Sequence, residues 1–274
     1  MGLRVNNNIA SVNAQRNLVN TTDRLSKSLQ RLSSGLRITR ASDDAAGLAI
    51  SENFRAEVRS LAQAQRNSND AISLLQIAEG ALNETSGILI RMRELAIQAS
   101  NGTLGSAERT TIDTEFQDLA SEITRIASVT QFNGRLLLNG NSSITFQIGT
   151  ENTSSDRIAV TGVDATASAI GITGTVAVST ADGAQSALGA LDSAISNVAS
   201  LRATFGTVQN RLESTIRSLA VAIENTSSAE SRIRDVDFAS ETAELTRNQV
   251  LQQAGVSVLG QANTSTQSAL SLLQ

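Results

Sequence analysis

Both ends of the chain carry a heptad-like pattern of apolar residues, and this pattern constrains the fold more than any other feature. Near the N-terminus its members follow steps of seven, four, three and four residues: Leu18, Leu25, Leu29, Leu32 and Leu36. Near the C-terminus the pattern comprises Phe238, Leu245, Val256, Leu259, Leu270 and Leu273. This spacing places apolar side chains on one stripe of a helix, where they suit a partner helix. We therefore expect the two ends to pack against each other or against other copies of the chain.

The residue inventory excludes several kinds of chemistry. The 274 residues include no His, Cys, Pro, Trp or Tyr and only six Phe. Without His or Cys the chain offers no imidazole base, thiolate nucleophile, zinc-finger ligand set or disulfide. Carboxylate catalysis and oxygen-ligated metals remain open in principle, but few aromatic residues are available to line a pocket. We therefore expect no enzyme, no catalytic residues, and no metal or cofactor.

Net charge and hydropathy limit the classes of partner that the chain can bind. The net charge of −4 gives no basic field for nucleic acid. No apolar run reaches the roughly 18 residues that a membrane-spanning helix needs. Residues 1–17 lack both the basic and the apolar region of a cleaved secretory signal. We expect no nucleic-acid partner and no membrane insertion, and either a cytoplasmic location or an export route that reads no such signal.

The periodicity predicts three helices in the first half of the chain. The first covers residues 3–36 and the second runs from about 44 to 100. Ser42 is the candidate N-cap of the second helix, with Asp43 and Asp44 in its first turn. A metal or acid–base role for this aspartate pair is the less favoured alternative. A third helix begins after a glycine-containing turn, with Ser106 as its candidate cap.

In the middle of the chain the spacing of the apolar residues changes. Ile144, Phe146 and Ile148 alternate with polar residues, as do Ile158 and Val160, which predicts one or two small β-hairpins. The Gly-, Ala-, Ser- and Thr-rich stretch that follows reads as loop with weak strand content.

Helical periodicity resumes near residue 185, and a phase change at 226–231 is expected to separate this helix from the C-terminal one. The expected fold is mainly α: a hairpin of long helices that forms a coiled-coil or bundle rod, with a small β-hairpin region at its tip. A second apolar stripe on the 44–100 helix indicates contact with more than one neighbouring helix.

Several segments resemble those of bacterial flagellin, in the same order along the chain. On the N-terminal side these are RLSSGLRI (31–38), ASDDAAGLAIS (41–51), IRMRELAIQASNGT (90–103) and FNGRLLLNG (132–140). On the C-terminal side they are QNRLEST (209–215), SRIRDVDFASETAELTRNQVLQQAG (231–255) and QANTSTQSALSLLQ (261–274). Each block alone is weakly specific, whereas their ordered occurrence at both termini is strongly specific.

The resemblance implies a structural subunit of the secreted, extracellular flagellar filament that serves bacterial motility. It implies three regions: a terminal coiled-coil domain of the inner tube (1–43 with 232–274), a helical rod domain of the outer tube (44–140 with 185–231), and a short variable tip (141–184). Many flagellins carry large inserted domains in the middle, so the short tip implies a thin, smooth filament. A hook–filament junction protein, which shares the coiled-coil ends, is the alternative.

The resemblance also implies partners. These are further copies of the chain, an export chaperone on the C-terminal helix, the flagellar secretion apparatus, and the filament cap and hook-associated junction proteins. Arg91, Leu95 and Glu115 match family residues that contact the vertebrate Toll-like receptor for flagellin. Subunit packing is the alternative role for these three residues. We expect Arg91 and Leu95 on the exposed side of one helix, with the Glu115 carboxylate on its antiparallel neighbour.

The terminal patterns predict coupled folding and assembly. Burial of a leucine yields roughly 1.5–3 kcal/mol only where a partner stripe is present, whereas ordering each residue costs on the order of 1–2 kcal/mol. We therefore expect largely disordered ends in the monomer that fold on polymerisation.

Overall fold

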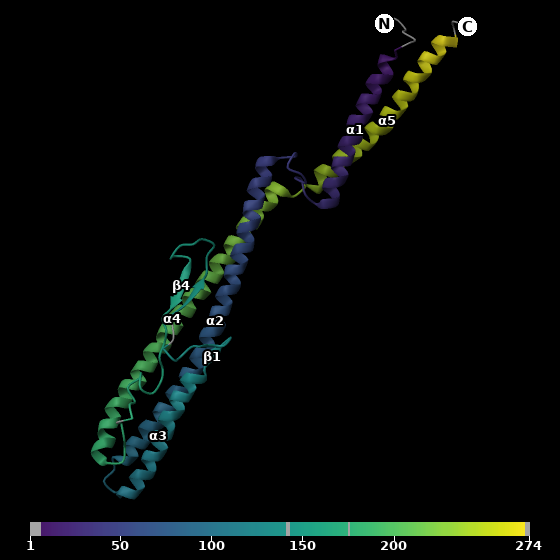
Figure 1. Ribbon diagram of the computed structural model, residues 1–274. Helices are drawn as coiled ribbons and strands as arrows, with labels where there is room; N and C mark the ends of the chain where they lie inside the picture. The colour runs from purple at the N-terminus through teal and green to yellow at the C-terminus, as the bar shows by residue number, and fades with distance from the viewer. Residues whose placement is uncertain (1–6, 141–142, 175, 272–274) are drawn as a thin grey trace. The chain divides into compact units, whose positions relative to one another are not determined.

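The computed structural model describes residues 7–140, 143–174 and 176–271, which are mainly α-helical (Figure 1). The helices are α1 (Ile9–Ser34), α2 (Ala45–Ala99), α3 (Ser106–Val129), α4 (Ala181–Arg234) and α5 (Phe238–Ser271). The strands are β1 (Gln131–Phe132), β2 (Arg135–Leu136), β3 (Ile144–Gln147) and β4 (Arg157–Val160). The expected mainly α fold with a small antiparallel β region is confirmed.

The chain divides into two compact units. The terminal unit comprises residues 1–58 and 225–274, and the central unit comprises residues 59–224. The first residues of the expected 3–36 helix and Leu273 lie outside the described residues.

In the terminal unit, α1 and α5 lie side by side and antiparallel (Figure 1). The α1 helix ends at Gly35, whose φ of 71° places it in the left-handed conformation that glycine adopts without a Cβ penalty. Asp237 begins α5, because its Oδ1 accepts the Ala239 N–H at 2.9 Å.

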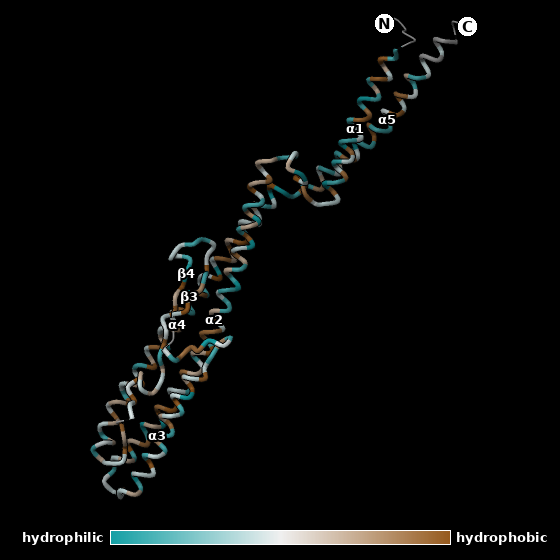
Figure 2. Tube along the Cα trace, in the orientation of Figure 1, coloured by the Kyte–Doolittle hydropathy of each residue, from teal (hydrophilic) through white to brown (hydrophobic). Residues whose placement is uncertain are grey.

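The central unit has one large apolar core to which α2, α3 and α4 each contribute. Figure 2 shows hydrophobic positions recurring along all three helices. The bulkiest fully buried members are Leu75, Leu82, Leu89, Met92, Leu95, Phe116, Ile123, Leu138, Ile170, Leu191 and Leu212. The two apolar stripes of α2 thus meet partners from several elements, as the pattern predicted.

Two hairpins lie between α3 and α4. β3 pairs with β4 in the register Phe146↔Ile158, so the hairpin that the alternation predicted is confirmed. A shorter hairpin, β1–β2, turns at Asn133 and Gly134, whose φ values of 49° and 77° suit a tight hairpin turn. The sequence predicted one or two hairpins in this region, but the alternation did not mark residues 131–136.

The stretch expected to be loop is packed into the core. Its small and branched side chains are buried: Val163, Ala165, Ala167, Ile170, Ile172 and Val178. Backbone bonds join it to the segment after β2, since the Gly140 N–H donates to the Val163 carbonyl at 3.0 Å. The segment therefore contributes to the core of the central unit, which its composition did not reveal.

Three expected boundaries were wrong. The N-cap of α2 is Asp44, whose Oδ1 accepts the Gly47 N–H at 2.8 Å, rather than Ser42. The N-cap of α3 is Gly105, without a side-chain bond, rather than Ser106. The α4 helix continues through 226–231 and ends at Arg234, because a helix can rotate its buried face without breaking.

Candidate assembly interface

The α1–α5 pair contains most of the residues that the terminal patterns singled out. Leu18, Leu25, Leu32 and Leu36 are half-buried, as are Leu245 and Leu259. Three others are exposed, by 50% for Leu29, 57% for Phe238 and 56% for Val256. Leu270 lies within α5, and Leu273 lies outside the described residues. The predicted stripe is therefore split between an internal seam and an outward face.

The internal seam follows a strict heptad on both helices but is unusually polar. The seam positions of α1 are Ser11, Ala14, Leu18, Thr21, Leu25, Ser28 and Leu32. Those of α5 are Glu241, Leu245, Asn248, Gln252, Gly255, Leu259 and Ala262. Seams of stable two-stranded coiled coils carry branched apolar residues at these positions. The pairing of α1 with α5 is accordingly weak as a source of burial energy.

Hydrogen bonds at one end of the seam and an ion pair at the other end fix its register. Asn8 Nδ2 donates to the Ala262 carbonyl at 2.9 Å, and the Ser11 hydroxyl donates to Asn263 Oδ1 at 2.9 Å. At the other end, Arg31 Nη1 lies 3.5 Å from Glu241 Oε2. Polar contacts of this kind specify register at a cost in stability.

The outward faces of α1 and α5 concentrate exposed apolar side chains. Of the fifteen large apolar residues that are exposed in the described part of the chain, nine lie on these two helices. They are Ile9, Val12, Val19, Leu29, Phe238, Val250, Leu251, Val256 and Val258. Exposed apolar side chains that gather on one pair of helices are candidates for contact with a partner. The helix pair thus has several polar side chains in its internal seam, while nine large apolar side chains remain exposed.

A groove of about 410 Å³ runs between the two helices. Its α5 wall is entirely apolar and consists of Leu251, Ala254, Gly255 and Val258. Its α1 wall adds Ala14 and Leu18 together with polar Asn17, Asn20, Thr21 and Arg24. The groove therefore accepts an apolar side chain with polar groups at one edge.

The carboxylate of Asp43 holds the turn between α1 and α2. Asp43, with 8% of its side chain exposed, lies 2.6 Å from Lys27 Nζ. Its Oδ2 also accepts the Thr39 hydroxyl at 3.0 Å and the Thr39 and Arg40 N–H groups at 3.2 Å. The lysine, followed by these hydrogen bonds, holds the pKa of Asp43 far below its ordinary value. The aspartate pair thus serves in a turn and a helix cap.

Two of the family-like blocks meet in this unit. Leu36 and Asp235 form an isolated antiparallel bridge, and the Val236 N–H donates to the Gly35 carbonyl at 3.0 Å. Arg37 Nη2 donates to the Ile233 carbonyl at the end of α4. These backbone contacts join RLSSGLRI to SRIRDVDF, and the periodicity gave no signal for them.

An ion pair reinforces the same region. Arg234 Nη1 lies 2.7 Å from Glu52 Oε1 on α2 and lowers the pKa of that carboxyl below its ordinary value. Glu52 is half-exposed, so solvent screens the interaction and limits its value.

The three candidate receptor residues lie in the central unit. Arg91 Nη2 on α2 lies 3.0 Å from Glu115 Oε1 on α3, and about half of each side chain is exposed. Glu94, followed by Glu115, raises the pKa of Arg91. Leu95 is only 1% exposed, which contradicts its expected place on the exposed side of α2. Leu95 belongs to the core, because it follows the buried stripe through Leu89, Met92 and Ala96.

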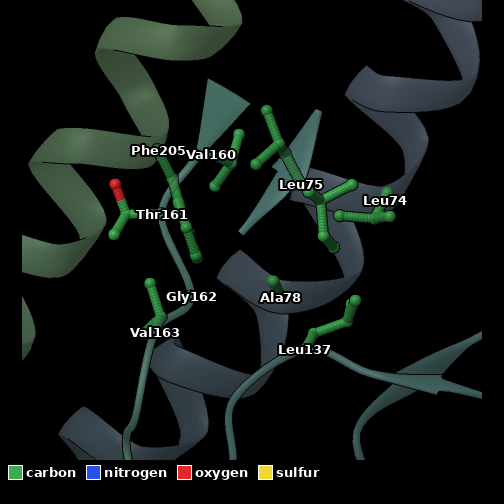
Figure 3. A pocket seen from close by; sticks show the side chains of 10 residues that line it. Leu74, Leu75, Ala78, Leu137, Val160, Thr161, Gly162, Val163 and Phe205 are labelled. Carbon is green, nitrogen blue, oxygen red and sulfur yellow. The ribbon is translucent and has the colours of Figure 1, made fainter. Parts of the chain in front are cut away.

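One apolar concavity of the central unit is too small to hold a ligand. Figure 3 shows this concavity, where β4 and the segment after it pack against α2 and α4. It is a void of about 10 Å³ lined mainly by apolar side chains, including Leu75, Val160 and Phe205. Within the described residues no acidic cluster could hold a metal ion, and no helix is long and apolar enough to cross a membrane.

Comparisons with known proteins cover nearly the whole chain. Residues 5–143 match the bacterial flagellin N-terminal helical region, and residues 188–273 match the bacterial flagellin C-terminal helical region. A flagellin of Halalkalibacterium halodurans is 45% identical over 98% of this chain and 99% of its own length. A flagellar filament 33 kDa core protein of Treponema phagedenis is 42% identical over 98% of this chain and 99% of its own length.

A solved structure agrees with these relatives. The crystal structure of Bacillus cereus flagellin is 35% identical and covers 56% of this chain and 88% of its own, with a TM-score of 0.51. The described residues that carry the outward apolar face lie within the matched terminal regions. This chain therefore belongs to the bacterial flagellin family, whose members are structural subunits of the flagellar filament and not enzymes.

Proposed function

We propose that copies of this chain assemble into the filament through the outward apolar face of α1 and α5. The observation that carries the proposal is the gathering of nine exposed apolar side chains on these two helices. Because each of them is already about half covered, its full burial contributes about half of the roughly 1.5–3 kcal/mol of a fully exposed side chain, on the order of 1 kcal/mol. In this proposal, residues 1–43 with 232–274 form an inner tube, residues 44–140 with 185–231 form an outer tube, and residues 141–184 form the variable tip.

The polar seam supports coupled folding and assembly. Among the side chains that the structure describes, only Ala14 and Ser28 of α1 and Glu241 and Asn248 of α5 are buried. Ordering these helices costs on the order of 1–2 kcal/mol per residue, which this seam alone does not offset. The terminal helices therefore become ordered when neighbouring subunits cover their outward valines.

Seeded elongation tests the proposal. Purified monomer is mixed with sheared filaments, and elongation is followed by light scattering. The parent elongates, whereas Val256→Ser, which removes an exposed apolar side chain, elongates more slowly. Gln253→Ser is the matched control, because it changes an exposed polar residue of the same helix to the same residue. A parent that stays monomeric with seeds present, or equal rates for both variants, contradicts the proposal.

Export through the flagellar secretion apparatus, and hence an extracellular location, is part of the same proposal. Phe238, Val250 and Leu251 are exposed apolar side chains of α5 that an export chaperone would cover before secretion. Outside the cell, the cap and the hook-associated junction proteins would contact the ends of the polymer. The first step is tested by a pull-down of the chaperone with the full chain, in which residues 235–274 make the contact. The pull-down should be lost on Phe238→Ser.

Recognition by a vertebrate Toll-like receptor is proposed for Arg91 and Glu115, with Leu95 supporting the helix from within the core. The exposed Arg91–Glu115 pair offers both charges to a partner. Arg91→Ala monomer should lose receptor signalling, whereas Arg125→Ala, which breaks an exposed ion pair with Glu122, should not. Unchanged signalling by Arg91→Ala rules the proposal out.

A further inference from the structure

The α5 helix contains two interior glycines, Gly255 and Gly260. A glycine inside a helix is less favourable than alanine, because its backbone loses more conformational freedom on folding. The two positions differ in their surroundings, and this difference carries the inference.

At Gly255, α1 packs directly onto the backbone of α5. A Cβ at this position would lie 3.3 Å from Leu18 Cδ1, which is tighter than ordinary van der Waals contact. At Gly260, a Cβ would have no atom within 4 Å. Gly255 is thus the interior glycine of α5 against which a side chain of α1 is seated.

We propose that Gly255 is a positioning residue for assembly: it lets Leu18 lie against α5 and so shapes the groove that receives an apolar side chain from a second copy of this chain. Leu18 and Gly255 both line that groove. A methyl group at 255 requires Leu18 to move by a few tenths of an ångström, which alters the groove between α1 and α5. This inference rests on the proposed assembly through the terminal helices.

The second copy is the occupant that the composition of the groove favours. Its α5 wall is apolar throughout, whereas Asn17, Asn20 and Arg24 supply hydrogen-bonding groups along the α1 edge. The same two helices carry exposed apolar residues outside the groove, among them Val12, Val19 and Val250. A groove on one part of a surface and matching side chains on another part give a head-to-tail contact that propagates as a helix.

Gly255→Ala and Gly260→Ala form a matched pair, because both replacements favour the helix and only the first meets Leu18. In seeded elongation, Gly260→Ala should elongate as fast as the parent or faster. Gly255→Ala should elongate roughly tenfold more slowly, as expected for overpacking at a close contact. Equal rates for the two variants overturn the inference while leaving the proposed function intact.

A second change keeps the test independent of a general folding defect. Leu18→Val removes the Cδ1 atom that the new methyl would meet, so Leu18→Val/Gly255→Ala should elongate faster than Gly255→Ala alone. Failure of this rescue overturns the role assigned to Leu18. If the parent itself does not elongate, the proposed function is contradicted. A failure of the proposed function is therefore distinguishable from a failure of the inference about Gly255.

Discussion

Lys27 Nζ lies 2.6 Å from Asp43 Oδ1, so the one lysine of the chain ties α1 to the turn that leads into α2. Asp43 also accepts two backbone N–H groups and the Thr39 hydroxyl. A nearly buried carboxylate with this set of donors stabilises the turn far more than an exposed ion pair does.

Asp43→Asn should destabilise the terminal unit by about 1–3 kcal/mol, because the amide loses the charged partner and leaves Lys27 unpaired. The measurement is the temperature at which filaments depolymerise, followed by far-UV circular dichroism. Glu244→Gln is the control, since its pair with Arg247 is exposed and contributes about 0.5 kcal/mol or less. Equal effects of the two variants would show that Asp43 stabilises the terminal unit no more than an exposed ion pair does.

The contribution of Asp43 should depend on pH in one direction. Its folded-state pKa is lowered, so its stabilisation is complete above the unfolded value of about 3.9 and is lost as pH falls towards the folded pKa. The difference in melting temperature between the parent and Asp43→Asn should be constant from neutral pH down to about pH 5. It should shrink below about pH 4; a difference that grows there contradicts the assignment.

Phe205 and Phe238 provide a matched pair of aromatic truncations. Phe205 is 2% exposed in the central core, so Phe205→Ala should destabilise the monomer by about 3–5 kcal/mol. Phe238 is 57% exposed, so Phe238→Ala should leave monomer stability nearly unchanged and slow seeded elongation. Denaturant unfolding of the monomer, compared with elongation rates, separates the two roles. A destabilised Phe238→Ala monomer would mean that this side chain already has a partner there.

Truncation of Arg91 and truncation of Leu95 should likewise have different effects on the stability of the monomer. Leu95→Ala should cost about 2–5 kcal/mol in the free energy of unfolding of the monomer, because it opens a cavity in the core. Arg91→Ala should cost less than about 1 kcal/mol, because both members of its ion pair are half-exposed. Chemical denaturation of both variants checks this prediction. If Arg91→Ala lost much of its free energy of unfolding, a loss of receptor signalling by this variant would no longer indicate a lost contact.

The sequence predicted the elements whose patterns are long or strict. The β3–β4 hairpin followed from the alternation of Ile144, Phe146 and Ile148, and α2 and α3 followed from their apolar stripes. The packed stretch after β4 was missed because Val163, Ala165 and Ala167 are small, and their burial depends on neighbours distant in sequence. Ser42 and Asp44 have similar capping propensity, so the choice between them needed the three-dimensional turn.

The candidate interface was predictable in part. The heptad spacing identified Leu18, Leu25 and Leu245 but not the polar residues that share their seam, such as Ser28 and Asn248. Periodicity marks which positions face one direction and does not say whether a partner helix or solvent lies there. The bridge between Leu36 and Asp235 had no signal at all, because it depends on backbone groups.

Amide hydrogen exchange along α1 and α5, compared between purified monomer and seeded filament, tests the central claim most directly. We expect rapid exchange at Val12, Val19, Val250 and Val256 in the monomer and strong protection in the filament, because neighbouring subunits supply the apolar partners that one chain lacks. Equal, strong protection of both helices in monomer and filament would contradict it.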